Sequence, residues 1–196
     1  YTIAQKGPIM VATSPFKEWN VSYGGDSLFV TSKASAYVEG ATLSLPFFES
    51  EIAEKTGLLS IPSPNNTLLN SMWSKRGLVT FFIDQVGTKI LPITTLAQKC
   101  AWGSGTYLAC AVPRIIPRGT EGLPDDWYQG RISFSDDLFI IDTTLNEKFP
   151  LYTFTEEDGI FDVTNITLSK QNDLLTFNKH QDKTLWLLNT NLITAE

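Results

Sequence analysis

The sequence predicts an all-β protein whose fold is a β-propeller of about four blades, and three observations support that prediction. An anchor residue, a short turn and two or three apolar residues recur at a nearly regular spacing. The stretches between these copies alternate like strands and are rich in β-branched and aromatic residues. Only the short stretch 50–55 has a helical pattern, and a helix of that length is not stable alone.

The repeat is anchored at Tyr23, Pro62, Trp102 and Leu168. The first three anchors are about 40 residues apart, and the step to the fourth contains an insertion of about 26 residues. A period of about 40 residues with turn-rich hairpins is typical of propeller blades, each of which is a four-stranded antiparallel sheet. A β-sandwich is the alternative, but sandwich strands carry no such repeat.

Each copy predicts a hairpin, and the residues that follow predict the outer strands of the same blade. In chain order the predicted segments are 21–30, 61–69, 77–84, 88–93, 100–109, 166–175 and 184–189. The opening segment 2–16 has the pattern of the last strand of a preceding blade. We therefore expect an arc or lobe of a larger propeller, because an open arc otherwise exposes edge strands that proteins normally cover.

Composition limits the possible functions. The length fits one propeller domain or half-domain spanning 1–196, with a long insertion loop at 113–131 between blades. The net charge is −6 and no basic patch is present, which argues against a nucleic-acid partner. No apolar run is long enough to span a bilayer.

Cys100 and Cys110 flank the turn of the third predicted hairpin. If a glycine adds one bulged residue to that turn, the two cysteines face each other on neighbouring strands, within disulfide distance. A disulfide would indicate an oxidising compartment. Two free buried thiols and a redox or metal site are the alternatives.

The stretch from Pro124 to Asp142 is rich in aspartate and raises the question of a catalytic or metal site. Asp136 and Asp137 fall where the alternation of one strand breaks and another begins, so they are expected to form a turn. A Ca²⁺ site or an acid/base pair is the functional alternative. The favoured interpretation is a connection between strands.

The insertion is nevertheless the best candidate for ligand binding, since long propeller loops often carry function. Aromatic residues and arginines supply much of the energy of interfaces. The candidate residues are Trp127, Tyr128, Arg114, Arg118, Arg131, Asp125 and Asp126. The alternative for Trp127 is that it packs beneath its own loop.

Motifs for catalysis are weak. His180, the single histidine, lies in a polar hairpin turn and is expected to be exposed. No Gly-x-Ser-x-Gly elbow and no phosphate-binding glycine loop occurs. We predict no cofactor, no metal site and no catalytic residue.

The hairpin at 63–69, Ser-Pro-Asn-Asn-Thr-Leu-Leu, resembles the Trp-Ser-Pro-Asp-Gly-x-x-Leu-Ala hairpin of TolB-like and dipeptidyl-peptidase-type β-propellers. The stretches 14–22, 99–113 and 124–137 resemble envelope-associated propeller proteins of candidate-phyla bacteria of the Patescibacteria and Parcubacteria type. The sequence departs from that pattern between Leu45 and Ile61. The resemblance implies a C-terminal part of a protein that lies outside the cytoplasm, behind an N-terminal membrane anchor.

These expectations combine into a non-enzymatic, extracytoplasmic binding or scaffold module whose loops hold a protein or polysaccharide partner. The absent N-terminal half of the propeller, or a second copy of the chain, would complete the ring. The alternative is a glycan-active enzyme in which carboxylates from several blades converge on the central channel. A structural element of a surface assembly is a third possibility.

Overall fold

The computed structural model describes residues 7, 10, 18–45, 49–74, 77–84, 86–116 and 122–190, without the side chains of 49–54 and 74. The strands are β1 (Trp19–Gly24), β2 (Ser27–Ser32), β3 (Glu39–Leu45), β4 (Glu49–Thr56), β5 (Leu59–Pro62), β6 (Leu68–Ser74), β7 (Gly77–Ile83), β8 (Thr88–Ile90), β9 (Cys100–Trp102), β10 (Tyr107–Pro113), β11 (Asp136–Asp142), β12 (Glu147–Tyr152), β13 (Val163–Leu168), β14 (Leu174–Lys179) and β15 (Leu185–Asn189). The helices are a 3-10 turn, η1 (Ala97–Lys99), and α1 (Asp125–Tyr128).

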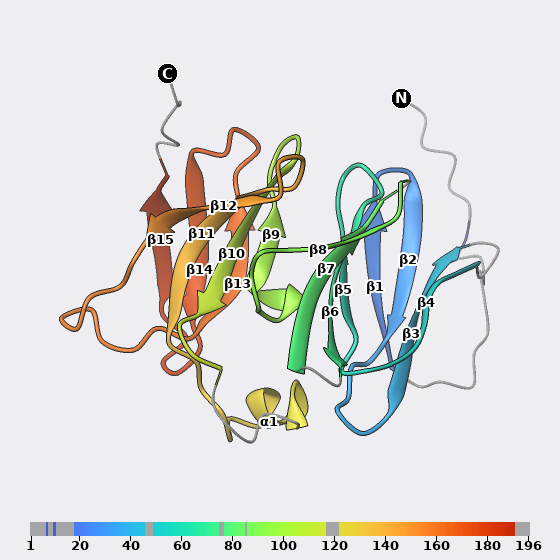
Figure 1. Ribbon diagram of the computed structural model, residues 1–196, viewed down its shortest axis with the longest axis horizontal. Coiled ribbons are helices and arrows are strands. Elements are labelled where there is room, and N and C mark those ends of the chain that lie inside the picture. Colours follow the sequence, from blue (N-terminus) through green and yellow to red (C-terminus); the bar gives the residue numbers. More distant parts are fainter. Residues whose placement is uncertain are drawn as a thin grey trace.

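The described strands form four antiparallel sheets, β1–β4, β5–β8, β9–β12 and β13–β15, and each sheet is a blade. Within a blade, consecutive strands are neighbours, as in a propeller. Figure 1 shows the first and last blades at opposite sides of the molecule, with the other two between them. The predicted four-bladed β-propeller is confirmed.

The anchors of the sequence repeat occupy equivalent places. Each anchor lies at or next to the end of the first strand of its blade, where it pairs with a leucine of the second strand. The pairs are Tyr23↔Leu28, Pro62↔Leu68, Trp102↔Leu108 and Leu168↔Leu175. The period read from the sequence is therefore the period of the blades.

Two local predictions were wrong. Residues 50–55 lie in strand β4, which pairs with β3, so the partner strand overrides the weak helical pattern. The insertion 113–131 connects β10 to β11, which are neighbours in one sheet, so it lies inside the third blade and not between blades. The opening segment 2–16 lies almost entirely outside the described residues.

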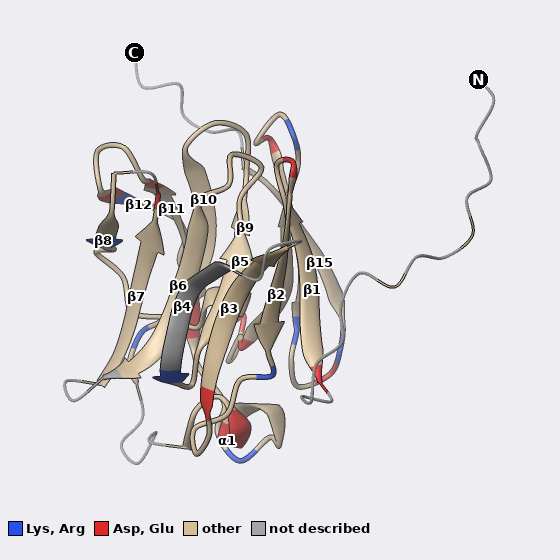
Figure 2. Ribbon diagram, turned by 90° about the vertical axis from the view of Figure 1, so that its right-hand side faces the viewer, with Lys and Arg blue, Asp and Glu red and all other residues tan. Residues whose placement is uncertain are grey.

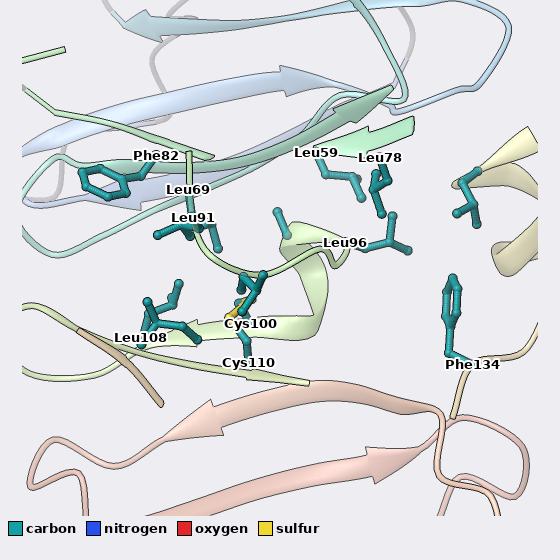
Figure 3. Packing of buried hydrophobic residues seen from close by; sticks show 14 of the residues in the cluster. Leu59, Leu69, Leu78, Phe82, Leu91, Leu96, Cys100, Leu108, Cys110 and Phe134 are labelled. Atoms are coloured by element: carbon teal, nitrogen blue, oxygen red, sulfur yellow. A yellow bond between two sulfur atoms is a disulfide. The ribbon is translucent and has the colours of Figure 1, made fainter. Parts of the chain in front are cut away.

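Apolar side chains pack between successive blades. The largest cluster joins the second and third blades, and Figure 3 shows Leu69 and Phe82 on one side of it and Leu108 and Cys110 on the other. Leu96, from the connection before η1, lies between the two blades (Figure 3). A second cluster joins the third and fourth blades, and a small one lies at the second blade.

Turn glycines let neighbouring hairpins approach closely. A Cβ on Gly24 would lie 2.6 Å from the Cβ of Pro62, and one on Gly103 would lie 2.2 Å from Asn172 Oδ1. The first contact joins blades one and two, and the second joins blades three and four. These turns require glycine because of the neighbouring blade.

Candidate functional site

A cavity of about 840 Å³ lies among the first strands of the four blades. The four anchors, Tyr23, Pro62, Trp102 and Leu168, all line it. The other lining residues are Gly25, Ile61, Pro64, Gln98, Cys100, Ala101, Trp127, Thr164, Asn165, Ile166 and Thr167. Because the same register position of every blade faces it, the cavity is the central channel of this part of the propeller.

The cavity lining mixes apolar and polar groups and is uncharged. No acidic or basic side chain belongs to its lining within the described part of the chain. Tyr23 is 77% exposed and therefore available to a ligand. Trp102 is half-buried, and its indole N–H donates to the carbonyl of Ile61, 3.2 Å away, which fixes the ring between two blades.

Backbone groups also face the cavity. The strands β1, β5, β9 and β13 are each at the edge of their sheet, so one side of each strand has no neighbour within that sheet. Edge strands present unpaired N–H and C=O groups that can pair with another chain. The cavity thus combines aromatic surface with backbone donors and acceptors.

The insertion covers one end of this region, where Figure 1 shows α1 below the gap between the two halves of the molecule. Asp125 accepts a hydrogen bond from the amide of Ala36, in the first blade, at 2.6 Å. Tyr128 donates its hydroxyl to Gln98 Oε1 at 2.7 Å, and burial raises the pKa of this phenol to about 12. Hydrogen bonds from both ends of α1 therefore hold the insertion to the blades.

The predicted arginine and aspartate ligands are engaged within the chain. Arg114 forms a two-point contact with Asp137, at 2.6 and 3.0 Å, and this hydrogen-bonded partner raises the pKa of the guanidinium. Arg131 pairs with Asp126 at 2.8 Å. Arg118 lies outside the described residues. Figure 2 shows the charged residues gathered mainly at turns and strand ends.

Cys100 and Cys110 are bonded to each other, as the favoured alternative predicts. They are directly paired residues of β9 and β10, and both are buried in the cluster between the second and third blades. Gly105 adopts a positive φ of 68° in the turn between these strands. The disulfide therefore fixes the inner hairpin of the third blade beside the cavity.

A buried charged cluster lies next to the cavity, and sequence reasoning did not find it. The side chain of Lys99 is fully buried, with its Nζ 2.5 Å from Asp162 Oδ1 and 2.8 Å from Asp136 Oδ2. Both carboxylates are also fully buried. The ammonium donates a further hydrogen bond to the carbonyl of Val163 at 3.0 Å. We call Lys99, Asp136 and Asp162 the buried triad.

Aromatic rings and donors enclose the buried triad. The Nζ of Lys99 lies 5.0 Å from the ring centre of Trp127 and 4.9 Å from that of Phe134. Asp162 Oδ2 accepts from Trp127 Nε1 at 3.0 Å, from the Phe134 amide at 3.1 Å and from Ser133 Oγ at 3.2 Å. For Trp127 the sequence left open both ligand binding and packing beneath its own loop, and its 4% exposure is in line with the second alternative.

The prediction that Asp136 and Asp137 form a turn is wrong: both begin β11, where they pair with Pro113 and Val112. Asp136 Oδ2 accepts from the Val163 amide at 2.7 Å, while Asp136 Oδ1 is buried without a hydrogen-bond partner. Burial raises the pKa of this carboxyl to about 6, against the opposing effect of Lys99.

His180 is half-buried, contrary to the expectation that it is exposed. Its ring stacks on Trp127 with 5.2 Å between ring centres, and its amide donates to the Asp162 carbonyl at 2.7 Å. Burial lowers the pKa of its imidazole. The fourth blade thus closes over the buried triad.

A sequence signal for this cluster did exist. Asp162 lies between Phe161 and Val163, both buried, and a charged residue inside an apolar run needs a buried partner. The partner, Lys99, is remote in sequence and does not lie within an apolar run, so nothing in its neighbours indicates that it is buried. No group of three or more potential metal ligands occurs within the described residues.

The carboxylates do not converge on the channel as the enzyme hypothesis requires. Asp125, Asp126 and Asp137 are bound to separate partners around the insertion. Asp136 and Asp162 do meet, but around Lys99 in the core, where neither is exposed to solvent.

No protein-family model and no curated protein matches the sequence. A solved structure from Agrobacterium tumefaciens, described as a candidate TolB, superimposes with a TM-score of 0.59 at 14% identity. The match covers 92% of this chain and 61% of that one, so this chain spans less than two thirds of its neighbour's length. The channel, the hairpin repeat and this likeness together identify the fold as a TolB-like β-propeller.

Proposed function

We propose that the chain is a non-enzymatic binding module that holds an extended segment of a partner protein in its central cavity. The observation that carries this proposal is the convergence of four equivalent anchors on one uncharged cavity of about 840 Å³. Ligand sites are typically concave and mostly apolar, with a few polar groups that orient the ligand. The fold resemblance alone would not specify such a site.

A polypeptide fits this cavity better than a polysaccharide. Edge strands recognise extended peptides through backbone hydrogen bonds, while pockets receive alternate side chains. The first strand of each blade is an edge strand. Tyr23, Trp102 and the prolines Pro62 and Pro64 supply apolar surface between these strands. An uncharged lining favours an apolar or neutral segment over an acidic or basic one.

The proposed location is outside the cytoplasm. The Cys100–Cys110 disulfide supports it, since such bonds persist in oxidising compartments. We further propose membrane anchoring, which rests on the sequence resemblance to envelope-associated propellers. Among the described residues, no helix has the length and hydrophobicity to cross a bilayer.

Selection from a displayed peptide library tests the proposal. Peptides that bind the chain should lose at least about tenfold in affinity with Tyr23→Ala. Tyr37→Ala is the matched control, because Tyr37 is 73% exposed against 77% for Tyr23 but does not line the cavity. Equal losses for the two variants, or binding only to a parallel glycan array, would contradict the proposal.

A further inference from the structure

We propose that the buried triad is the site of a covalent modification, an intramolecular isopeptide bond between Lys99 Nζ and Asp162 Cγ. The chain itself would make this bond on folding, without a cofactor. The Lys99 Nζ and Asp162 Oδ1 atoms are already 2.5 Å apart, and Asp136 Oδ2 touches the same nitrogen at 2.8 Å. The inference is independent of what the cavity binds.

Proximity is the first requirement for forming an amide from an amine and a carboxyl group. Holding two reacting groups in contact replaces a bimolecular encounter and is equivalent to concentrations of about 10⁵–10⁸ M. Lys99 is fixed by the carbonyl of Val163 and by two rings, so its amine is held against Asp162. Complete burial of both side chains also excludes water, which would reverse the reaction.

Stabilisation of the developing oxyanion is the second requirement. Attack on Cγ places negative charge on one carboxyl oxygen, and donors aimed at that oxygen lower the barrier. Asp162 Oδ2 accepts from the Phe134 amide at 3.1 Å and from Ser133 Oγ at 3.2 Å, and it shares the indole N–H of Trp127, which lies 3.0 Å from Oδ2 and 3.1 Å from Oδ1. Gln181 donates to Ser133 Oγ at 2.9 Å and so orients this hydroxyl toward Asp162.

A proton carrier is the third requirement, and Asp136 fits that role. Its pKa of about 6, raised by burial, allows it to hold and exchange a proton near neutral pH. Its Oδ1 has no hydrogen-bond partner. Asp136 would therefore act as the general acid and base of the reaction.

The step balances without an oxidant or other co-reactant. A proton passes from the Lys99 ammonium to Asp162 Oδ1, and the amine's electron pair then forms the N–Cγ bond as Oδ2 takes the negative charge. Asp136 gives a proton to the departing Oδ1 and receives one from the nitrogen. The Cγ–Oδ1 bond breaks with its electron pair on oxygen, one water leaves, and Oδ2 becomes the amide carbonyl.

The product suits the site better than the ion pair. An amide is neutral, so the cost of keeping two opposite charges out of water is removed. The amide oxygen keeps the three donors that Asp162 Oδ2 has now. The bond would join the connection before β9 to the residue before β13, which ties the third blade to the start of the fourth.

Intact mass spectrometry of the denatured, reduced 196-residue chain tests this inference. The expected mass is lower than that of the sequence by one water. Trypsin should fail to cut after Lys99, and the peptides that contain Lys99 and Asp162 should remain joined after reduction. A full sequence mass with a free peptide ending at Lys99 would overturn the proposal.

Two variants sharpen the test. Asp136→Asn removes the proton carrier with little change in shape, so the mass of this variant should equal that of its sequence. Asp137→Asn changes the neighbouring acid and should be lighter than its sequence by one water, as wild type is. The wild-type mass decides the question even if Asp136→Asn does not fold. A water loss that maps to Asp158 and Gly159 instead, where an aspartate–glycine pair can cyclise, would also count against the bond.

Discussion

The contact between the first two blades and the contact between the last two are built differently. Between blades one and two, hydroxyls form a chain from Thr31 through Thr42 to Ser60, with steps of 3.0 and 2.7 Å. Ser60 then donates to Asn70 Oδ1 at 2.6 Å. The contact between blades three and four is instead aromatic, with Phe161 stacked on Phe154 at 4.1 Å between ring centres.

The two contacts therefore fix the position of one blade against the next in different ways. A buried hydroxyl chain is directional, and an unmade bond in it costs more than a made one contributes. An aromatic cluster is stabilised mainly by the area it buries and by close packing. The polar contact therefore specifies geometry, while the apolar contact between blades three and four stabilises the fold mainly through the area it buries.

Phe161→Ala is expected to have the largest effect. Phe161 is 2% exposed and also contacts Phe177 and Trp186, so its loss leaves a cavity in the apolar contact. The free energy of unfolding should fall by about 3–5 kcal/mol. Urea denaturation measures it, with Phe149→Ala, at a site 46% exposed, as the control. A loss as small as the control's would refute the assignment of stability to the apolar contact.

Removing the disulfide should have the next largest effect. The Cys100→Ala/Cys110→Ala variant loses a bond that closes a short loop, which lowers the free energy of unfolding by about 2–3 kcal/mol. Thermal unfolding of wild type with and without a thiol reductant provides the measurement. Because the bond lies in the cluster between blades two and three, fluorescence of the tryptophans should report the same transition. An unchanged midpoint would mean that packing alone fixes the hairpin.

Stability should fall as the pH rises through the range between about 4 and 6. The folded chain keeps a proton on Asp136, whose pKa is about 6, after the unfolded chain has released its own. The free energy of unfolding should fall by an amount on the order of 2–3 kcal/mol, and the fall is complete once the pH exceeds the pKa of Asp136 in the folded chain. Asp158 and Asp182, whose pKa values are lowered by hydrogen bonds from Thr155 and Thr184, contribute with the opposite sign. Wild type and Asp136→Asn are compared by denaturation at several pH values. Loss of the proposed Lys99–Asp162 bond in the variant shifts its stability at every pH, so the change of the difference with pH measures the titration of Asp136, and parallel curves would contradict it.

Asn70→Ala should have the smallest effect and addresses the polar contact directly. It leaves Ser60 without its acceptor in a buried chain, at a cost of about 1–3 kcal/mol. The Ser60→Ala/Asn70→Ala double variant should lose less than the sum of the two single variants, since both ends of one bond are removed. Additive losses in urea denaturation would show that the hydroxyl chain does not act as a unit.

The sequence contains enough information to place the hairpins but not the contacts between them. Anchors such as Trp102 and Leu168 were found because a blade repeats a local pattern of turn and strand. The cysteine pairing followed from the same local register. Local patterns are short-range, so the prediction succeeded where structure is set within a few residues.

The buried triad could not be found in this way, because its members come from segments far apart in the chain. Lys99 resembles any surface lysine until the fold brings Asp162 to it from 63 positions away. Asp136 was mistaken for a turn residue, since turn and buried partner both use a carboxylate that accepts backbone amides. The misassigned stretch 50–55 fails for the same reason, as its conformation is set by pairing with β3.

The nearness of Lys99 and Asp162 has a consequence for how this architecture can change in length. The whole segment between them, which includes β9–β12 and α1, begins and ends at the same place in the fold. Positions where two chain ends lie together are where insertion of a segment is tolerated. Because the third blade also packs against both of its neighbours, any blade added or lost at this point must present matching apolar faces on both sides.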